Sequence, residues 1–540
     1  MSVAILSRSP PLQPNPVAAD ASHDDTLARV LGIWREALNL PGVRADDVFL
    51  DLGAYSLAAM AVLARVEAEF GHRPSLLSLL SSDSTPRRMS ELLRERQLEI
   101  EPAAVALRPV SERRMGYPVP APHRKMVLDC ARRQTTRYSV MQAFAISGHF
   151  DLVACQNAID RLIDRHGLLR TSFRLEGEEV TMHVADEARL TLAVQECSED
   201  RAQSLVSSKA LAAPFDMTLA PLWRVTVLSV SEQRSFLVSE RHHAITDGVS
   251  EELWLDEFLA AYRGETLVEP ELMFKDYAVW QAEHVGRSAL EAAVEYWSRK
   301  LSGMRPTRIA CDSPDPDAQP GYDEHVLELG AGERVTLDRF CAERRVTRFA
   351  CVVAALFVAI SEAASASEVT VAARFSKRNL ARTERMLGCF IDKILIRCSV
   401  LEHDSFAALA ERAHVTVVEA VDHMPVPYET LEQSLIERGA VAADPGDELF
   451  SIRLNYLPPV RKTLELPEYG LRLDALEAKK TSSKYPMAIN VEDGEGWTKV
   501  AIFSDRRAFS AQTVSSLLAR LSSVLQAGLS APERPLFPRR

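Results

Sequence analysis

Apolar residues in the first hundred positions recur every three or four residues, which is the spacing of a helix with one buried face. One such helix is predicted by the set Leu27, Val30, Leu31, Trp34 and Leu38. The run 57–70 shows the same spacing, and Thr85-Pro86 opens a last short helix because proline is tolerated in a first helical turn. Residues 24–96 are therefore predicted to form a small all-α domain.

The longer remainder of the chain mixes helical and strand-like patterns, which is typical of an α/β fold. Helical spacing of apolar residues appears in the segments 153–166, 251–262, 334–344, 405–421 and 511–527. Strand-like apolar runs appear in the segments 369–373, 394–400, 451–456 and 498–503. Residues 97–117 hold few periodic apolar positions and are predicted to be a linker. The proline-rich, polar residues 1–23 lack the apolar core of a signal peptide and are expected to be a disordered lead-in.

Size and composition narrow the class of protein. With 540 residues, 47% of them hydrophobic, the chain can bury large cores and is expected to form several domains. The net charge is −12 and no dense run of lysine and arginine is present, which argues against nucleic acid as a partner. No apolar run reaches transmembrane length, so we expect no membrane partner. The eight cysteines lack C-x-x-C or zinc-type spacing, which predicts reduced thiols, no metal site and a cytoplasmic enzyme.

Two adjacent histidines, His242 and His243, follow an apolar run at 235–240 and precede Asp247-Gly248. The pattern predicts a strand that carries an imidazole into a site, with a turn at Asp247-Gly248. Imidazole is the side chain best matched to proton transfer near neutral pH. Neighbouring side chains on a strand point to opposite faces, so one histidine is expected to be structural and the other chemical. The alternative is a pair that is structural only.

The stretch 242–248 resembles the HHxxxDG signature of the condensation domains of nonribosomal peptide synthetases. Four further segments resemble motifs of that family and stand in the family's order: RHGLLRTSF (165–173), APFD with PLWR (213–224), FKDYAVWQ (274–281) and LGCFID (387–392). The family's fold is a pair of chloramphenicol-acetyltransferase-like α/β lobes in a V, with the active site in a tunnel between them. The resemblance places the two lobes at 118–285 and 290–535.

The resemblance also assigns roles within the motif. His243 is the catalytic candidate, which would either deprotonate or align the acceptor's amine or hydroxyl, and the residues alone do not choose between these roles. His242 and Gly248 would support the motif, Gly248 by allowing a backbone angle or a close approach. Asp247 is expected to form a structural ion pair with Arg378, because a buried carboxylate without a partner is costly.

The small helical domain contains the segment DVFLDLGAYSL (47–57), which resembles the attachment motif of carrier proteins of the peptidyl or acyl type. This resemblance implies a four-helix carrier domain at 24–96. Ser56 would carry a covalent 4'-phosphopantetheine arm, added by a phosphopantetheinyl transferase, with the phosphate near the positive end of a helix. Without the motif, Ser56 would be an ordinary N-cap. Ala54-Tyr55 stands where the family usually has a second glycine and then His or Asp, which leaves the carrier's class open.

The two resemblances together imply a condensation enzyme of a nonribosomal peptide or hybrid polyketide pathway. An acyl, aminoacyl or peptidyl thioester on the Ser56 arm would react with an amine or alcohol held at His243, giving an amide or ester and a free thiol. No adenylation domain fits in the chain, so we expect a trans-acting loading enzyme or an upstream synthetase or polyketide synthase module as partner. The acceptor is either a free small molecule, in a product-releasing enzyme, or bound to a separate carrier.

Other members of the superfamily provide the alternatives. Wax-ester-synthase-like and polyketide-associated acyltransferases share HHxxxDG, although FKDYAVWQ and the fused carrier argue against the former. An epimerisation domain needs an acidic motif that RFSKR (374–378) lacks, and a non-catalytic recruitment domain often loses a histidine that is present here. One departure from the condensation pattern concerns the tunnel: His123 replaces a usual glutamine, which points to an unusual donor or acceptor preference.

Overall fold

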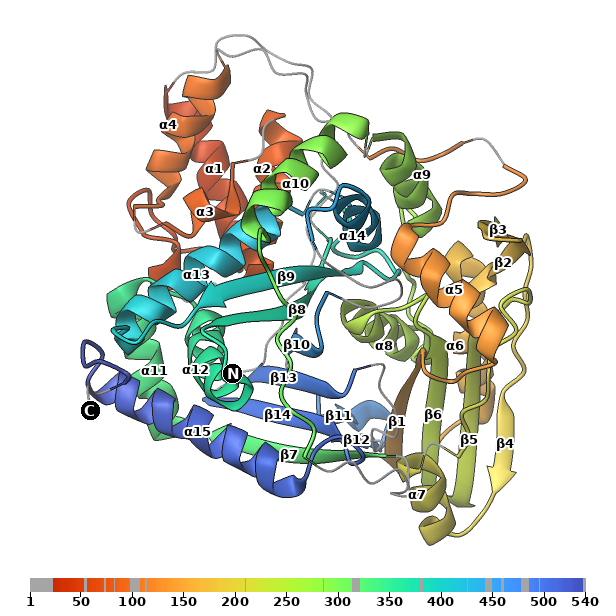
Figure 1. Ribbon diagram of the computed structural model, residues 1–540. Helices are drawn as coiled ribbons and strands as arrows, with labels where there is room; N and C mark the ends of the chain where they lie inside the picture. Colours follow the sequence, from red (N-terminus) through yellow and green to blue (C-terminus); the bar gives the residue numbers. More distant parts are fainter. Residues whose placement is uncertain are drawn as a thin grey trace. The chain divides into compact units, whose positions relative to one another are not determined.

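The structure is a computed structural model of the 540-residue chain. It describes residues 23–52, 56–71, 74–81, 83–97, 107–111, 114–208, 210–284, 286–312, 321–378, 380, 382–424, 426–441, 449–457, 461–476, 485–494 and 496–537. Figure 1 shows the helices and strands, coloured along the sequence. By its internal contacts the chain divides into two compact units. One unit holds residues 1–106, 338–348 and 378–384, and the other holds the remainder.

The described N-terminal residues form the helices α1 (His23–Leu38), α2 (Ser56–Phe70), α3 (Leu76–Leu79) and α4 (Pro86–Gln97), with a short 3-10 turn at Leu50–Leu52. Trp34 lies at the centre of their core. It is fully buried, packs edge-on against Phe49 at 5.1 Å, and directs its indole N–H at the sulfur of Met89, 3.4 Å away. Before α2, the carboxylate of Asp46 accepts two hydrogen bonds from Arg87 of α4, at 2.7 and 3.0 Å. The predicted all-α domain of four helices is confirmed.

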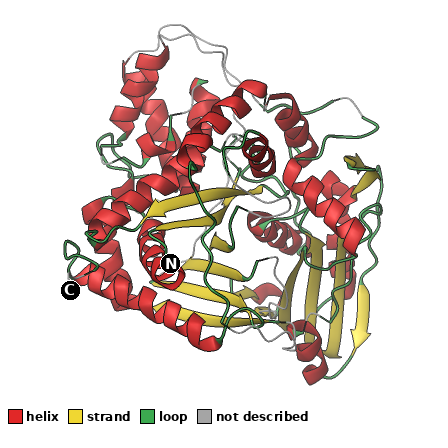
Figure 2. Ribbon diagram, in the orientation of Figure 1, coloured by secondary structure: helices red, strands yellow, loops and turns green. Residues whose placement is uncertain are grey.

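The rest of the chain is α/β (Figure 2). Its helices are α5 (Ala121–Arg133), α6 (Leu152–Arg165), α7 (Glu199–Ser207), α8 (Gly248–Tyr262), α9 (Phe274–His284), α10 (Arg287–Lys300), α11 (Ala331–Arg344), α12 (Arg348–Ala364), α13 (Phe406–Asp422), α14 (Tyr428–Glu437) and α15 (Ala511–Ser530). Its strands are β1 (Ser139–Ser147), β2 (Thr171–Glu176), β3 (Glu179–Val184), β4 (Ala193–Glu196), β5 (Trp223–Ser231), β6 (Arg234–His242), β7 (Tyr322–Leu329), β8 (Glu368–Ser376), β9 (Ile391–Ser399), β10 (Ile452–Leu457), β11 (Thr463–Leu466), β12 (Leu471–Leu476), β13 (Met487–Gly494) and β14 (Trp497–Asp505). Each helical or strand-like segment predicted for this region coincides with one of these elements to within a few residues.

The first large sheet is six-stranded and has the order β11-β12-β1-β6-β5-β4. Strand β6 is antiparallel to both β1 and β5, and its residues 235–242 are all buried, so it is covered on both faces. Strands β11 and β12 reach this sheet through the antiparallel pairing of β12 with β1. Both strands fall within the predicted C-terminal lobe, yet they belong to the sheet formed by strands of the N-terminal lobe. No pattern in the sequence indicates that they pair with this sheet.

The second large sheet is also six-stranded, with the order β7-β14-β13-β10-β8-β9. It is mixed, because β10 runs parallel to both β8 and β13 while the other pairs are antiparallel. Residues 349–360 of α12 are buried without a break, as expected of a helix that is apolar on all sides. Two sheets with flanking helices confirm the predicted pair of α/β lobes.

The predicted lead-in and linker are only partly described. Of residues 1–23, only His23 is described, as the first residue of α1. Residues 98–106 of the predicted linker also lie outside the described part, and its last residue, Tyr117, exchanges backbone hydrogen bonds with Met182 at 2.8 and 2.9 Å. Among the described helices none is long and apolar enough alone to cross a membrane, and α11 and α12 reach that threshold only as a pair bent by 103°.

Candidate active site

His243 directly follows β6, and the sheet fixes its backbone. Its N–H donates to the carbonyl of Tyr138 at 2.8 Å, beside the antiparallel pairing of β1 and β6. The ring atom Nδ1 lies 2.7 Å from the carbonyl oxygen of Thr246. A carbonyl oxygen can only accept a hydrogen bond, so Nδ1 carries the proton and Nε2 keeps its lone pair. The residue is only partly buried, so it retains surface that a solute can reach.

His242, the last residue of β6, sits in a different environment. It is 1% exposed, and its Nδ1 accepts the backbone N–H of Ala244 at 3.1 Å. Because Nδ1 accepts, the ring proton is on Nε2, which lies 3.1 Å from the sulfur of Cys130. Burial lowers the pKa of His242 to about 3, so the ring stays neutral. The two imidazoles thus have separate surroundings, as strand alternation predicts, and His242 has those of a structural group.

Asp247 joins the start of α8 to the segment that leads into β9. It is 2% exposed and is the N-cap of α8, with Oδ1 accepting the N–H of Ser250 at 2.8 Å. Its Oδ2 accepts the N–H of Phe390 at 3.0 Å. Ser250 reinforces the junction, because its hydroxyl donates to the carbonyl of Gly388 at 2.7 Å and accepts from the N–H of Gly388 at 3.0 Å. The HHxxxDG and LGCFID segments are therefore locked together at this point.

Arg378, the predicted ion-pair partner of Asp247, is buried, and its Nη1 donates to the carbonyl of Thr383 at 2.6 Å. The hydrogen bonds described for Asp247 go to backbone N–H groups. The Asp247–Arg378 ion pair stays a prediction.

The turn and the reason for Gly248 need correction. The turn occupies residues 243–246 rather than Asp247-Gly248, because Asp247 already caps α8 and Gly248 is the first helical residue. Gly248 does not adopt a left-handed backbone angle, and a Cβ added there would meet no atom within 4 Å. Since Gly248 is exposed, its missing side chain matters only for a molecule that approaches from outside.

The electrostatic surroundings of His243 favour the neutral ring. Burial lowers its pKa below the ordinary value of 6.5, and the positive charge of Arg374 lowers it further. The Thr246 carbonyl and the Asp247 carboxylate act in the opposite direction without cancelling these effects. At neutral pH, His243 therefore offers an unprotonated Nε2, which can accept a proton or a hydrogen bond.

Three neighbours of His243 were not predicted as site residues. The sulfur of Cys389 lies 3.7 Å from Nδ1 of His243. His123, on α5, packs against the ring of Phe274 at 5.1 Å, and burial, with help from the charge of His243, lowers its pKa to about 4. Arg374, on β8, acts on His243 through its charge. The substitution of His123 for the family's usual glutamine was a signal in the sequence, whereas Cys389 and Arg374 gave none.

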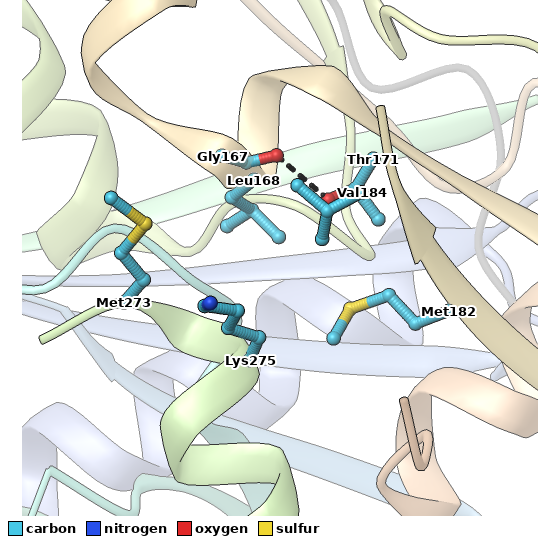
Figure 3. Close-up of a pocket in the computed structure, with 7 residues that line it drawn as sticks. All are labelled: Gly167, Leu168, Thr171, Met182, Val184, Met273 and Lys275. Carbon is cyan, nitrogen blue, oxygen red and sulfur yellow. Dashed lines mark hydrogen bonds between the residues drawn. The ribbon is translucent and has the colours of Figure 1, made fainter. Parts of the chain in front are cut away.

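A small cavity lies between β3, the turn before β2 and α9 (Figure 3). It measures about 10 Å³ and is lined by Gly167, Leu168, Thr171, Met182, Val184, Met273 and Lys275. That volume holds about one water molecule, so the cavity is no substrate passage. His243 does not line it, and the tunnel expected from the family stays a prediction.

The described start of α2 suits the expected cofactor. The helix begins at Ser56, whose side chain lies outside the described residues, and it runs for 15 residues. The first backbone N–H groups of a helix have no intrahelical partner, and the helix dipole favours an anion there. A phosphodiester on Ser56 therefore fits this position. Among the described residues, no group of three or more His, Cys, Asp or Glu side chains could hold a metal ion.

Two curated proteins are similar to this chain over almost its whole length. Surfactin synthase subunit 2 of Bacillus subtilis (strain 168) is 27% identical over 527 residues, which cover 96% of this chain and 14% of the relative. Tyrocidine synthase 3 of Brevibacillus parabrevis is 27% identical over 525 residues, which cover 95% of this chain and 8% of the relative. The chain thus spans only a small part of the length of these relatives.

Solved structures with the same fold include the X-domain from teicoplanin biosynthesis, with a TM-score of 0.70, 23% identity and coverage of 80% of this chain and 98% of that one. The condensation domain of the Monacolin K polyketide synthase MokA gives a TM-score of 0.66 at 18% identity, covering 77% and 98%. The family described as "Phosphopantetheine attachment site" matches residues 28–93, and the family described as "Condensation domain" matches residues 117–537. Because the latter match covers most of the chain, the protein belongs to the condensation-domain family, with a phosphopantetheine carrier domain in front of the condensation domain.

Proposed function

We propose that this protein transfers an acyl, aminoacyl or peptidyl group from a pantetheine arm on Ser56 to an amine or alcohol acceptor held at His243. One observation carries the proposal: the hydrogen bond from Nδ1 of His243 to the Thr246 carbonyl leaves Nε2 as an acceptor. The lowered pKa of His243 supports it, because a neutral ring is the form that can take a proton.

The transfer breaks one bond and forms one. The acceptor's nitrogen or oxygen attacks the thioester carbonyl, while Nε2 of His243 accepts the N–H or O–H hydrogen bond and takes or aligns the proton. The C–S bond then breaks, the proton passes to the departing sulfur, and the products are an amide or ester and the free thiol of the arm. An alcohol needs the base more than an amine does, because its proton is held more tightly.

The other motif residues would position this chemistry. Asp247 and Ser250 hold the start of α8 against the segment at Gly388 and Phe390, which fixes the turn that carries the Thr246 carbonyl. Gly248, the exposed first residue of α8, lets the substrate come close to the positive end of that helix, where an N–H group can stabilise a developing oxyanion.

The carrier domain implies a phosphopantetheinyl transferase as partner. We infer that the arm is loaded in trans by a separate enzyme or an upstream module, and that the acceptor is a free molecule or is bound to another carrier. The experiment is to load Ser56 with acyl-pantetheine groups, add amines or alcohols, and follow loss of the acyl group by intact-protein mass spectrometry. Transfer that needs His243 supports the proposal, and transfer at the same rate in His243→Ala contradicts the assigned role.

A second function follows from the likeness to the X-domain, one structure of which is a complex with OxyB. In that case the domain would bind another protein and carry out no transfer. The two functions make opposite predictions, because recruitment would survive His243→Ala while acyl transfer would not. The intact histidine pair and the free Nε2 favour transfer.

A further inference from the structure

Two arginines share one face of the second sheet. In the parallel pairing of β10 with β8, Arg453 lies opposite Ala372 and Asn455 lies opposite Arg374. Paired residues point to the same side of a sheet, and so do residues two apart on one strand. Arg374 and Arg453 are therefore neighbours on one face, together with Asn455. The opposite face of β10 carries apolar residues such as Leu454, which is fully buried.

Neither guanidinium has a counter-ion among the described residues. Arg453 is 8% exposed, its Nε makes no hydrogen bond, and its nearest described aromatic contact is the ring of Tyr485 at 5.7 Å. No hydrogen bond or ion pair is formed by the side chain of Arg374 within the described part of the chain. Burial and the charge of Arg374 lower the pKa of Arg453 to about 9, which leaves it protonated at neutral pH.

Two other buried arginines, Arg241 and Arg334, are paired with carboxylates. Arg241 bonds bidentately to the carboxylate of Glu251, and Arg334 donates to the carboxylate of Asp493. A buried charge is costly unless it is paired, so the unpaired charge of the buried Arg453, next to that of the partly buried Arg374, requires a cause.

One of the two arginines, Arg374, is close enough to the candidate catalytic residue for its charge to act there. The charge of Arg374 lowers the pKa of His243, and Cys389 and Tyr138 both act on the pKa of Arg374. These two residues are direct contacts of His243, through the Cys389 sulfur at 3.7 Å and the Tyr138 carbonyl at 2.8 Å. Arg374 and His243 therefore share electrostatic neighbours.

We propose that Arg374 and Arg453 bind a carboxylate of the substrate that reaches His243. A planar guanidinium matches the geometry of a carboxylate, and an anion between two arginines would compensate both charges. The inference rests on the proposed acyl transfer and names its substrate class. The carboxylate itself does not react: it positions the molecule while the C–S bond breaks and the new C–N or C–O bond forms.

The carboxylate can come from either of two molecules. A free amino acid or hydroxy acid acceptor carries its own carboxylate, whereas an aminoacyl group on a second carrier has lost it to the thioester. Alternatively, the acyl group on the Ser56 arm can end in a carboxylate. The phosphate of the arm is a poorer candidate, because the whole length of the arm separates it from the reacting thioester.

Matched substrate pairs test the inference on the full-length, phosphopantetheinylated protein. One arm of the experiment compares the proteinogenic amino acids with their carboxamides as acceptors. The other arm compares a succinyl group with its uncharged succinamoyl counterpart on Ser56. In one of these two comparisons, kcat/KM of the charged substrate is expected to be about 10- to 100-fold higher than that of its uncharged counterpart. This factor corresponds to the free energy of a charge-assisted hydrogen bond. Arg374→Gln and Arg453→Gln should each bring the ratio of the charged member's kcat/KM to the uncharged member's close to one. The ratio is the readout, because removal of the Arg374 charge also raises the pKa of His243 and so acts on both rates.

Controls separate this inference from the proposed function. Arg472→Gln removes an exposed arginine that pairs with Asp474 and should change neither rate. Arg453→Lys, which keeps the charge, should restore part of the preference. Calorimetric binding of the same amino acids and of succinate to His243→Ala protein needs no transfer, and should be lost when Arg374→Gln is added.

The outcomes are distinct. If no acyl transfer occurs but carboxylates bind in a way that depends on Arg374, the proposed function is wrong and the anion site at Arg374 and Arg453 is supported. Equal rates for charged and uncharged members in both arms overturn the anion site, and so does an equal loss of both rates in Arg374→Gln and Arg453→Gln.

Discussion

Asp247 and Phe390 are joined by a buried hydrogen bond, in which the N–H of Phe390 donates to Oδ2 of Asp247 at 3.0 Å. The other carboxylate oxygen caps α8 through Ser250. One side chain therefore ties the first helical turn after the double histidine to the segment that enters β9. Through this junction, the second lobe helps to fix the turn that holds His243.

Replacement of Asp247 should lower stability and activity together. Asp247→Ala removes both bonds and should cost about 1–3 kcal/mol of unfolding free energy. Asp247→Asn keeps an oxygen that can cap α8, but it turns an amide N–H₂ toward the N–H of Phe390. The Asn variant therefore measures the effect of losing the hydrogen bond to Phe390 alone. Urea denaturation and acyl-transfer rates measure both effects. Ser405→Ala, which removes the N-cap of α13, is the control and should lower stability alone. Lost turnover with unchanged stability in both Asp247 variants would contradict a structural role.

Gly388 and Gly248 provide a matched pair of substitutions. A Cβ at Gly388 would lie 2.3 Å from the ring of Phe274 and 2.7 Å from that of Phe390, so Gly388→Ala should cost about 1–3 kcal/mol by overpacking. A Cβ at Gly248 meets no atom within 4 Å, so Gly248→Ala should leave the thermal midpoint unchanged. If the substrate approaches this helix end, Gly248→Ala should still slow transfer. A destabilised Gly248→Ala, or a neutral Gly388→Ala, would be inconsistent with this geometry.

Local patterns were enough to predict some of the helices and strands of the fold. The spacing of apolar residues located helices such as α13 and α15, because one buried face imposes a helical period. The pairing of β12 with β1 could not be predicted, because it joins residues far apart in the chain. Strand order depends on tertiary packing, which no local pattern records.

For the candidate site, the sequence offers a signal only where a motif is present. The double histidine points to His243, whose catalytic role stays a prediction. The expected turn at Asp247-Gly248 is wrong, because Asp247 is the N-cap of α8. Nothing in the sequence indicates that Arg374 and Arg453 are unpaired, since a single charged residue in a strand usually marks a solvent-facing position. Only the register between β8 and β10 shows that Arg374 and Arg453 share a face.

The pH dependence of transfer should report the lowered pKa of His243. If the neutral ring is the active form, kcat/KM rises with pH through the pKa of the folded enzyme, so its acid limb should have a midpoint below 6.5. An uncharged alcohol acceptor keeps the substrate from titrating in this range. Arg374→Gln should move the midpoint upward, because a repelling positive charge is removed. A midpoint above 6.5 in the wild type, or no upward movement in Arg374→Gln, would contradict these surroundings.

Two buried histidines should make the fold sensitive to acid. Burial lowers the pKa of His242 to about 3 and that of His123 to about 4, against 6.5 for an exposed histidine. At a pH between the folded-state pKa and 6.5, the unfolded chain therefore binds more protons than the folded protein. The free energy of unfolding that these neutral histidines contribute above pH 6.5 is lost as the pH falls toward 4. Each group contributes roughly 3–5 kcal/mol. His123→Gln should reduce the loss in urea denaturation from pH 7 to about pH 4, and an unchanged pH slope would show that His123 is not held neutral.

The transfer of an acyl group from Ser56 under the control of His243 is tested most directly by mass spectrometry of the intact, loaded protein. Wild-type protein is expected to lose the acyl mass when an acceptor is added, His243→Ala to lose it roughly a hundred- to ten-thousand-fold more slowly, and Ser56→Ala never to gain the arm. Equal rates of loss in wild type and His243→Ala, or an arm attached to Ser56→Ala, would contradict the account.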